Sequence, residues 1–131
     1  MPTIEGHLDD QGMPFIDLQL VPSRSALTAL LDTGFDGELL VYYDDLRRAG
    51  IEVAADRIVQ ARLADGSDAT LLGATLIIDW FGKLRRVRAD IVPAIRPANA
   101  RPLVGCRLLR DSRLEIDFPR GTVLVSRDSG A

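Results

Sequence analysis

Hydrophobic and polar residues alternate with a period of two along most of the chain. This alternation is typical of β-strands that bury one face, and turns rich in Gly, Asp and Pro separate the alternating segments. The pattern predicts strands at residues 3–8, 15–21, 25–31, 39–41, 56–63, 69–79, 84–92, 113–118 and 122–126, with a brief apolar stretch at 103–105.

Two segments depart from this alternation and predict short helices. Residues 42–50 carry acidic residues early, basic residues late and Gly50 as a stop signal. Residues 106–111 are long enough for one or two helical turns, whereas the three prolines within residues 93–102 predict a loop. The expected fold class is therefore mostly β, a closed barrel or folded sheet with two short helices.

Composition places the chain among ordinary globular proteins. With 131 residues, 47% hydrophobic and 27% charged, a single domain over residues 1–131 is expected. The net charge of −3 provides no global basic field for a nucleic acid. The basic run at residues 83–88 is interpreted as the solvated face of a strand rather than a binding patch.

The chain offers little for membranes, metals or disulfides. Its longest uncharged apolar run, residues 71–78, is too short to span a bilayer, and its first residues lack the features of a signal peptide, so a cytoplasmic location is expected. Cys106 is the only cysteine and His7 the only histidine, and no motif links them as a nucleophile pair. We expect no metal and no cofactor.

The most informative segment is Asp32-Thr33-Gly34, which lies between two apolar predicted strands. A carboxylate that leaves a buried strand on a tight turn is held rigidly and is poorly solvated. Such conditions favour acid–base chemistry. The alternative is an Asx-type turn at a strand end, since Asp, Thr and Gly all favour turns.

Two further segments with a recognisable pattern follow later in the chain. Ala64-Asp65-Gly66-Ser67 predicts the tip of a long hairpin, because Asp-Gly is a strong turn signal. Leu103-Val104-Gly105 then precedes the second predicted helix.

This order of elements resembles the retropepsin-like aspartic peptidases, which include the retroviral proteases and small bacterial and archaeal relatives. The resemblance extends from about residue 15 to residue 125. It implies that Asp32 is the catalytic carboxylate and faces its copy from a second subunit. It also implies that Thr33 bonds to the partner loop and that Gly34 keeps the backbone clear for substrate.

The resemblance assigns roles to the later segments as well. The hairpin tip, with Asp65, Gly66 and Ser67, would be a flap that closes over the substrate. The apolar pair Leu103 and Val104 would support the Asp32 loop, and Gly105 would lie where any side chain would collide with that loop.

Two positions depart from the retroviral pattern. Phe35 stands where the retroviral enzymes carry Ala, so its ring would either block or line a substrate pocket. Asp36 matches an Asp that contacts the substrate main chain in those enzymes. The Arg that accompanies this Asp is missing, because Cys106 follows Gly105 where they have Arg.

The resemblance implies an aspartic endopeptidase that hydrolyses peptide bonds by a water activated between two Asp32 carboxyls of a homodimer. The expected partners are a second copy and a peptide or protein substrate, with no nucleic acid and no membrane. The first alternative is a non-catalytic peptide- or protein-binding module that retains this fold. An unrelated β-barrel that binds a small ligand is a further alternative.

Overall fold

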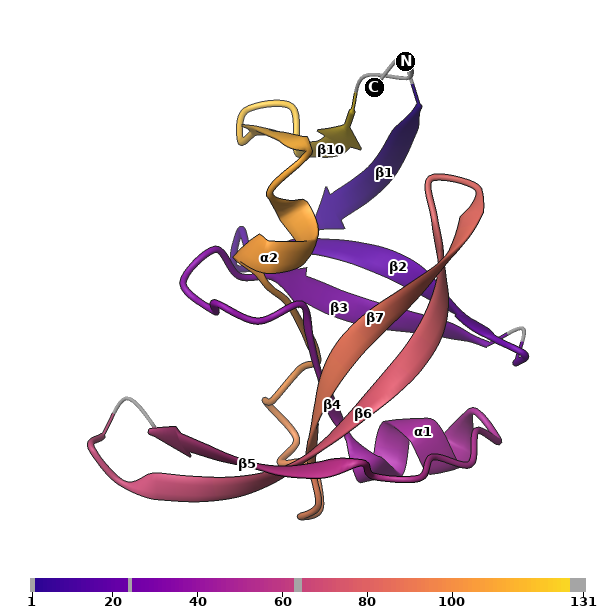
Figure 1. Ribbon diagram of the computed structural model, residues 1–131. Coiled ribbons are helices and arrows are strands. Elements are labelled where there is room, and N and C mark those ends of the chain that lie inside the picture. Colours follow the sequence, from indigo (N-terminus) through magenta and orange to yellow (C-terminus); the bar gives the residue numbers. More distant parts are fainter. Residues whose placement is uncertain (1, 24, 63–64, 128–131) are drawn as a thin grey trace.

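The computed structural model describes residues 2–23, 25–62 and 65–127 (Figure 1). The described strands are β1 (Thr3–Leu8), β2 (Pro14–Val21), β3 (Ala26–Leu31), β4 (Leu39–Tyr42), β5 (Arg57–Arg62), β6 (Asp68–Trp80), β7 (Lys83–Val92), β8 (Leu103–Val104), β9 (Arg113–Asp117) and β10 (Thr122–Ser126). The two helices are α1 (Tyr43–Arg48) and α2 (Cys106–Leu109).

The strands form one sheet that closes on itself. Their order is β5-β6-β7-β4-β8-β3-β2-β1-β10-β9, and an additional pairing joins β6 to β2. This pairing, from Gln19 opposite Asp79 to Val21 opposite Ile77, closes a barrel of β2, β3, β8, β4, β7 and β6. The expectation of a mostly-β closed barrel with two short helices is confirmed.

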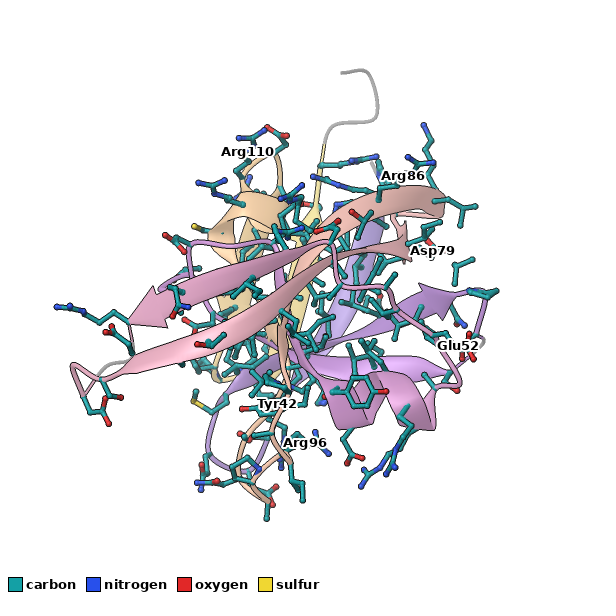
Figure 2. All side chains as sticks on the ribbon, turned by 60° about the horizontal axis from the view of Figure 1, so that its bottom comes forward. Tyr42, Glu52, Asp79, Arg86, Arg96 and Arg110 are labelled. Carbon is teal, nitrogen blue, oxygen red and sulfur yellow. The ribbon has the colours of Figure 1, made fainter. Side chains whose placement is uncertain are left out.

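The alternating pattern places one face of each barrel strand in the interior. Trp80, at the end of β6, is only 2% exposed, and Ile16, Leu39, Ile78 and Val104 are fully buried. Figure 2 shows charged side chains such as Arg86 and Arg110 at the outer surface. Burial of this apolar face is the main favourable contribution to folding, and it fixes the register of the strands.

The structure follows the predicted segments closely, with small differences at their ends. Residues 106–111 were expected to be helical, but α2 ends at Leu109. The strands predicted at residues 69–79 and 84–92 extend further toward each other, so that Trp80 and Lys83 form the last pair of β6 and β7. The turn needs only Phe81 and Gly82, with φ of 57° and 80°, the backbone typical of a two-residue hairpin loop.

The hairpin of β5 and β6 projects from the barrel, at the lower left of Figure 1. Near its tip the Asp65 carboxylate accepts hydrogen bonds from the Ser67 amide at 2.9 Å and the Ser67 hydroxyl at 2.5 Å. Gly66 has a φ of 86°, which glycine adopts without strain. Leu63 and Ala64, part of the predicted strand and tip, lie outside the described residues.

Neither described helix is long and apolar enough to cross a membrane. The cytoplasmic location stays a prediction from the sequence.

Candidate active site

Asp32 begins the loop between β3 and β4. The side chain is half-buried, and its Oδ1 accepts a hydrogen bond from the Gly34 amide at 2.9 Å. The Phe35 amide donates to the Asp32 carbonyl oxygen at 3.1 Å, so the backbone turns sharply. Thr33 and Gly34 are exposed at the tip of this turn. The Asx-type turn considered for this segment is therefore present, and it orients the carboxylate.

Strand β8 lies between the strands that enter and leave this loop. It runs parallel to β3, with Val104 opposite Leu31, and antiparallel to β4, with the same Val104 opposite Leu39. Both neighbours and Val104 are buried. The two ends of the loop are thereby fixed to one short strand.

Backbone hydrogen bonds continue this attachment around the loop. The α2 amides Cys106 and Arg107 point toward the loop and donate to it, which satisfies groups that a helix start leaves without partners. Four backbone hydrogen bonds join residues 104–107, from the end of β8 into α2, to the loop. They are Asp32 N to Val104 O at 2.9 Å, Gly105 N to Glu38 O at 3.0 Å, Cys106 N to Phe35 O at 2.9 Å and Arg107 N to Gly37 O at 3.2 Å.

Gly105 lies where the structure has no room for a side chain. A Cβ on Gly105 would collide with the Gly37 carbonyl oxygen and would lie 2.6 Å from Cδ2 of Phe35. Its φ of −98° is accessible to any residue, so the requirement for glycine comes from space alone. Leu103, Val104 and Gly105 thus lie beside the Asp32 loop, where the resemblance places them.

The Phe35 ring packs against Gly37 of its own loop and against Gly105, which follows β8. A Cβ on Gly37 would lie 2.5 Å from Cζ of Phe35, and the ring edge also contacts Gly105. The side chain is half-buried between them. Phe35 is not among the described residues that line the neighbouring cavity.

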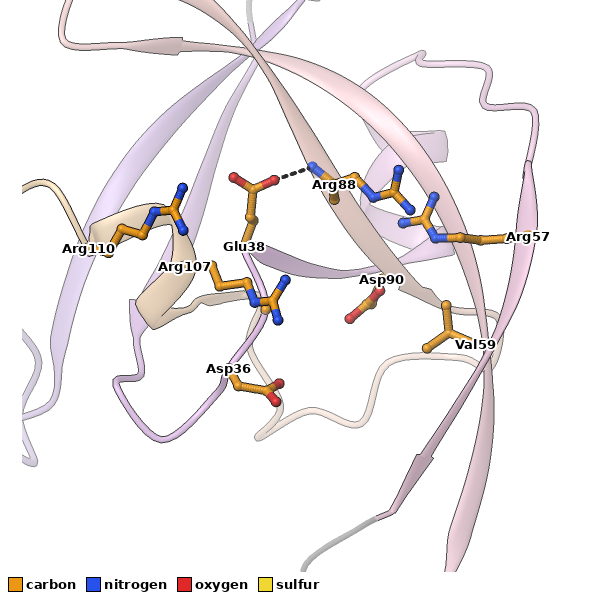
Figure 3. Close-up of a pocket in the computed structure, with 9 residues that line it drawn as sticks. Asp36, Glu38, Arg57, Val59, Arg88, Asp90, Arg107 and Arg110 are labelled. Atoms are coloured by element: carbon orange, nitrogen blue, oxygen red, sulfur yellow. Dashed lines mark hydrogen bonds between the residues drawn. The ribbon is translucent and has the colours of Figure 1, made fainter.

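A cavity of about 440 Å³ opens beside the loop (Figure 3). Residues 36–38 form one wall, and β5, β7 and α2 form the others. The lining includes the carboxylates of Asp36, Glu38 and Asp90 and the guanidinium groups of Arg57, Arg88, Arg107 and Arg110. Neither Asp32 nor the hairpin-tip residues Asp65, Gly66 and Ser67 belong to the described lining.

The acidic groups of the cavity differ in their surroundings. Glu38 forms an ion pair with Arg85 at 3.2 Å and accepts a hydrogen bond from the Arg88 amide at 2.9 Å. Burial raises the pKa of Asp90, and the nearby Asp36 carboxylate adds to this, although Arg57 and Arg88 oppose it. At the hairpin tip, the hydrogen bonds from Ser67 lower the pKa of Asp65.

Asp36 lacks the arginine that follows Gly105 in the retroviral pattern, but another arginine lies near it in the structure. Asp36 is exposed and forms no ion pair with any residue that the structure describes. Arg107, one position after Cys106, lines the same cavity (Figure 3). The shift by one position places an arginine at the start of α2 rather than directly after Gly105.

The other cavity residues were not foreseen from the sequence. Arg88 belongs to the run interpreted as a solvated strand face, yet it lines the cavity. The sequence does contain one signal for them, the spacing that places two residues on the same face of an element. Arg88 and Asp90 are two residues apart on β7, and Arg107 and Arg110 are three residues apart around α2. Arg57 comes from a strand distant in sequence, so only the fold brings it here.

Comparison with solved structures relates this architecture to known proteins. A retropepsin-like aspartic protease from Rickettsia conorii matches with a TM-score of 0.68 and 15% identity, covering 95% of this chain and 90% of that one. EIAV protease complexed with the inhibitor HBY-793 matches with a TM-score of 0.55 and 16% identity, covering 79% of this chain and 90% of that one. No protein-family model and no curated protein matches. The closed barrel and these two likenesses together show that the chain has the retropepsin-like fold.

Proposed function

We propose that this protein is an aspartic endopeptidase that works as a homodimer, with Asp32 of each copy in one shared active site. The observation that supports the proposal most is the attachment of the Asp32 loop to β8 and α2 by four backbone hydrogen bonds. A rigid loop in this fold presents a half-buried carboxylate at a fixed position. Such preorganisation is what acid–base catalysis requires.

One chain provides one Asp-Thr-Gly segment, and the proposed chemistry needs two carboxyls. Two carboxyls within hydrogen-bond distance do not both ionise, so the pair shares one proton. The ionised Asp32 accepts a proton from the attacking water, and the protonated Asp32 donates a hydrogen bond to the scissile carbonyl oxygen. A tetrahedral intermediate forms and then collapses: its C–N bond breaks, and the Asp32 that accepted the proton of the water gives that proton to the leaving amine.

Other residues of the loop and hairpin would assist. The exposed Thr33 is available to bond with the loop of a second copy. Gly34 leaves the approach to the carboxylate open, because even a methyl group there would lie 3.2 Å from Asp32 Oδ1. The hairpin tip around Gly66 would close over a bound peptide and exclude water. Leu103, Val104 and Gly105 would keep the loop in place.

The position of Phe35 bears on the alternative, a binding module without catalysis. A ring that filled the groove above Asp32 would favour that alternative. The ring instead packs against Gly37 and Gly105 of the loop and of the segment after β8. This placement favours the enzyme.

The proposal is tested by incubating the purified protein with a denatured protein substrate at mildly acidic pH and analysing the products by mass spectrometry. We expect cleavage by the wild type and none by Asp32→Asn. Asp10→Asn, which makes the same change in an exposed turn, should retain full activity and serves as the matched control. Equal cleavage by Asp32→Asn and the wild type would overturn the assignment.

A further inference from the structure

The cavity beside the Asp32 loop contains an arginine, Arg57, whose side chain packs over a glycine of the neighbouring strand. Arg57 on β5 lies opposite Gly73 on β6, and Gly73 in turn lies opposite Asp90 on β7. A Cβ on Gly73 would collide with the Arg57 side chain and lie 2.5 Å from its Cζ. The Arg57 side chain therefore lies directly over Gly73, so that β6 places no side chain between Arg57 and Asp90.

The guanidinium of Arg57 is also fixed from outside the cavity. Its Nη1 donates to Asp56 Oδ1 at 2.6 Å, and only 24% of its side chain is exposed. An arginine that is already ordered loses little further side-chain entropy when it binds a carboxylate. The strand pairing and Gly73 together preorganise this group.

Three more guanidinium groups surround the same space. Arg88 comes from β7, and Arg107 and Arg110 come from α2 and its C-terminal end (Figure 3). Within the described part of the chain, none of these three has an ion-pair partner.

The carboxylates of the cavity do not balance these charges. Glu38 is already paired with Arg85, which is not among the described lining residues. Asp36 and Asp90 remain, and burial raises the pKa of Asp90 above its ordinary value. Arg57 is likewise paired with Asp56, so the three guanidinium groups without a partner among the described residues face these two carboxylates, and positive charge is in excess. Guanidinium groups bind carboxylates in a bidentate manner.

We propose that this cavity binds an acidic side chain of the peptide substrate, with Arg57 and Arg107 as its main ligands. The inference rests on the proposed endopeptidase function, since it names the class of peptide that this site selects. Residues 36–38 join the cavity directly to the Asp32 loop. The acidic residue therefore lies within a few positions of the cleaved bond, and substrates with Glu or Asp there are preferred.

Peptide binding tests the inference without any need for hydrolysis. The probe is a fluorescein-labelled peptide of Ala and Phe with one central Glu, compared with its Gln and Lys versions on the Asp32→Asn protein by fluorescence anisotropy. We expect the Glu peptide to bind about tenfold more tightly than the Gln peptide, as for a charge-assisted bidentate contact.

Substitutions identify the groups responsible. Arg107→Gln and Arg57→Gln should each reduce the preference for Glu to about twofold or less. Arg120→Gln, at an exposed turn after β9, should keep it and serves as the matched control. Equal binding of the Glu and Gln peptides, tighter binding of the Lys peptide, or an unchanged preference in both cavity variants would overturn the inference.

Cleavage of a proteome-derived peptide library by the wild type separates this inference from the proposed function. Enrichment of acidic residues at one position near the cleaved bond, lost in Arg107→Gln, would support both. Cleavage without such enrichment would contradict the inference and leave the endopeptidase assignment in place. Failure to cleave any peptide would contradict the assignment, and the anisotropy measurement would still decide whether the cavity selects acidic side chains.

Discussion

The amide of Asp32 donates a hydrogen bond to the carbonyl oxygen of Val104, 2.9 Å away. Val104 is fully buried and is paired with both strands that border the Asp32 loop. The backbone at Asp32 is therefore positioned by the barrel core, and the carboxylate is oriented by the hydrogen bond from the Gly34 amide to its Oδ1. In this arrangement the stability of the barrel and the geometry of the candidate site depend on the same strand.

Gly105→Ala should destabilise the protein. The new Cβ would collide with the Gly37 carbonyl oxygen, and either the loop or α2 would have to move. Overpacking of this kind typically costs roughly 1–3 kcal/mol in the free energy of unfolding. Urea denaturation followed by circular dichroism measures the loss, and an unchanged midpoint would contradict the tight contact.

Gly34→Ala is the companion variant in the same loop. Its Cβ would meet only the Asp32 carboxylate, at 3.2 Å. We expect the free energy of unfolding to change by less than about 1 kcal/mol, while cleavage activity falls because the carboxylate is displaced. If Gly34→Ala lost as much stability as Gly105→Ala, the difference in room for a side chain at the two glycines would be contradicted.

The sequence predicts much of this fold because each element has a local cause. Alternation of apolar residues identified the strands to within one or two residues, and the Asp-Gly pair marked the tip of the long hairpin. The order of Asp32-Thr33-Gly34, the hairpin and Leu103-Val104-Gly105 indicated the retropepsin-like fold, which the likeness to solved structures supports.

The cavity could not be predicted in the same way, because it depends on contacts between distant segments. Arg57 and Asp90 meet only because β5 and β7 both pair with β6 at Gly73. In the sequence, Gly73 interrupts an apolar strand without evident reason. Arg107 stands one position later than the arginine of the retroviral pattern, so that pattern did not point to it, although its side chain lines the cavity with Asp36.

Gly73→Ala should raise the pKa of Asp90. The added methyl group displaces Arg57, whose positive charge holds that pKa down against the effect of burial. Arg57→Gln should produce a similar rise, and the double variant should add little, because both changes remove one interaction. NMR titration of the Asp90 carboxyl measures the shift. Arg62→Gln, near the other end of β5, is the control. An unaltered Asp90 pKa in Gly73→Ala would contradict the placement of the Arg57 side chain over Gly73 and close to Asp90.

Stability should depend on pH through Asp90. Burial raises the pKa of Asp90 above its ordinary value of 3.8, so the folded state holds this proton more tightly than the unfolded state. The stabilising contribution is complete below the unfolded pKa and is lost as the pH rises through the folded pKa. Asp90→Asn should therefore increase the free energy of unfolding, relative to the wild type, at neutral pH and much less at about pH 3.

Urea denaturation at a series of pH values checks this dependence. Asp10→Asn, in an exposed turn, should show a difference from the wild type that barely changes with pH. If the gain in Asp90→Asn were instead largest in acid, the sign of the linkage would be wrong and Asp90 would be stabilised as a carboxylate.

The most direct test of the central claim is the activity of mixed dimers. Wild type and Asp32→Asn are combined in equal amounts, then unfolded and refolded together so that subunits pair at random. The cleavage rate is compared with that of a reference sample that has the same total protein concentration and contains wild type alone. If each active site needs an Asp32 from both copies, activity falls to about one quarter, the share of dimers with two intact carboxyls. Activity of about one half, the value for chains that act independently, would contradict the shared site.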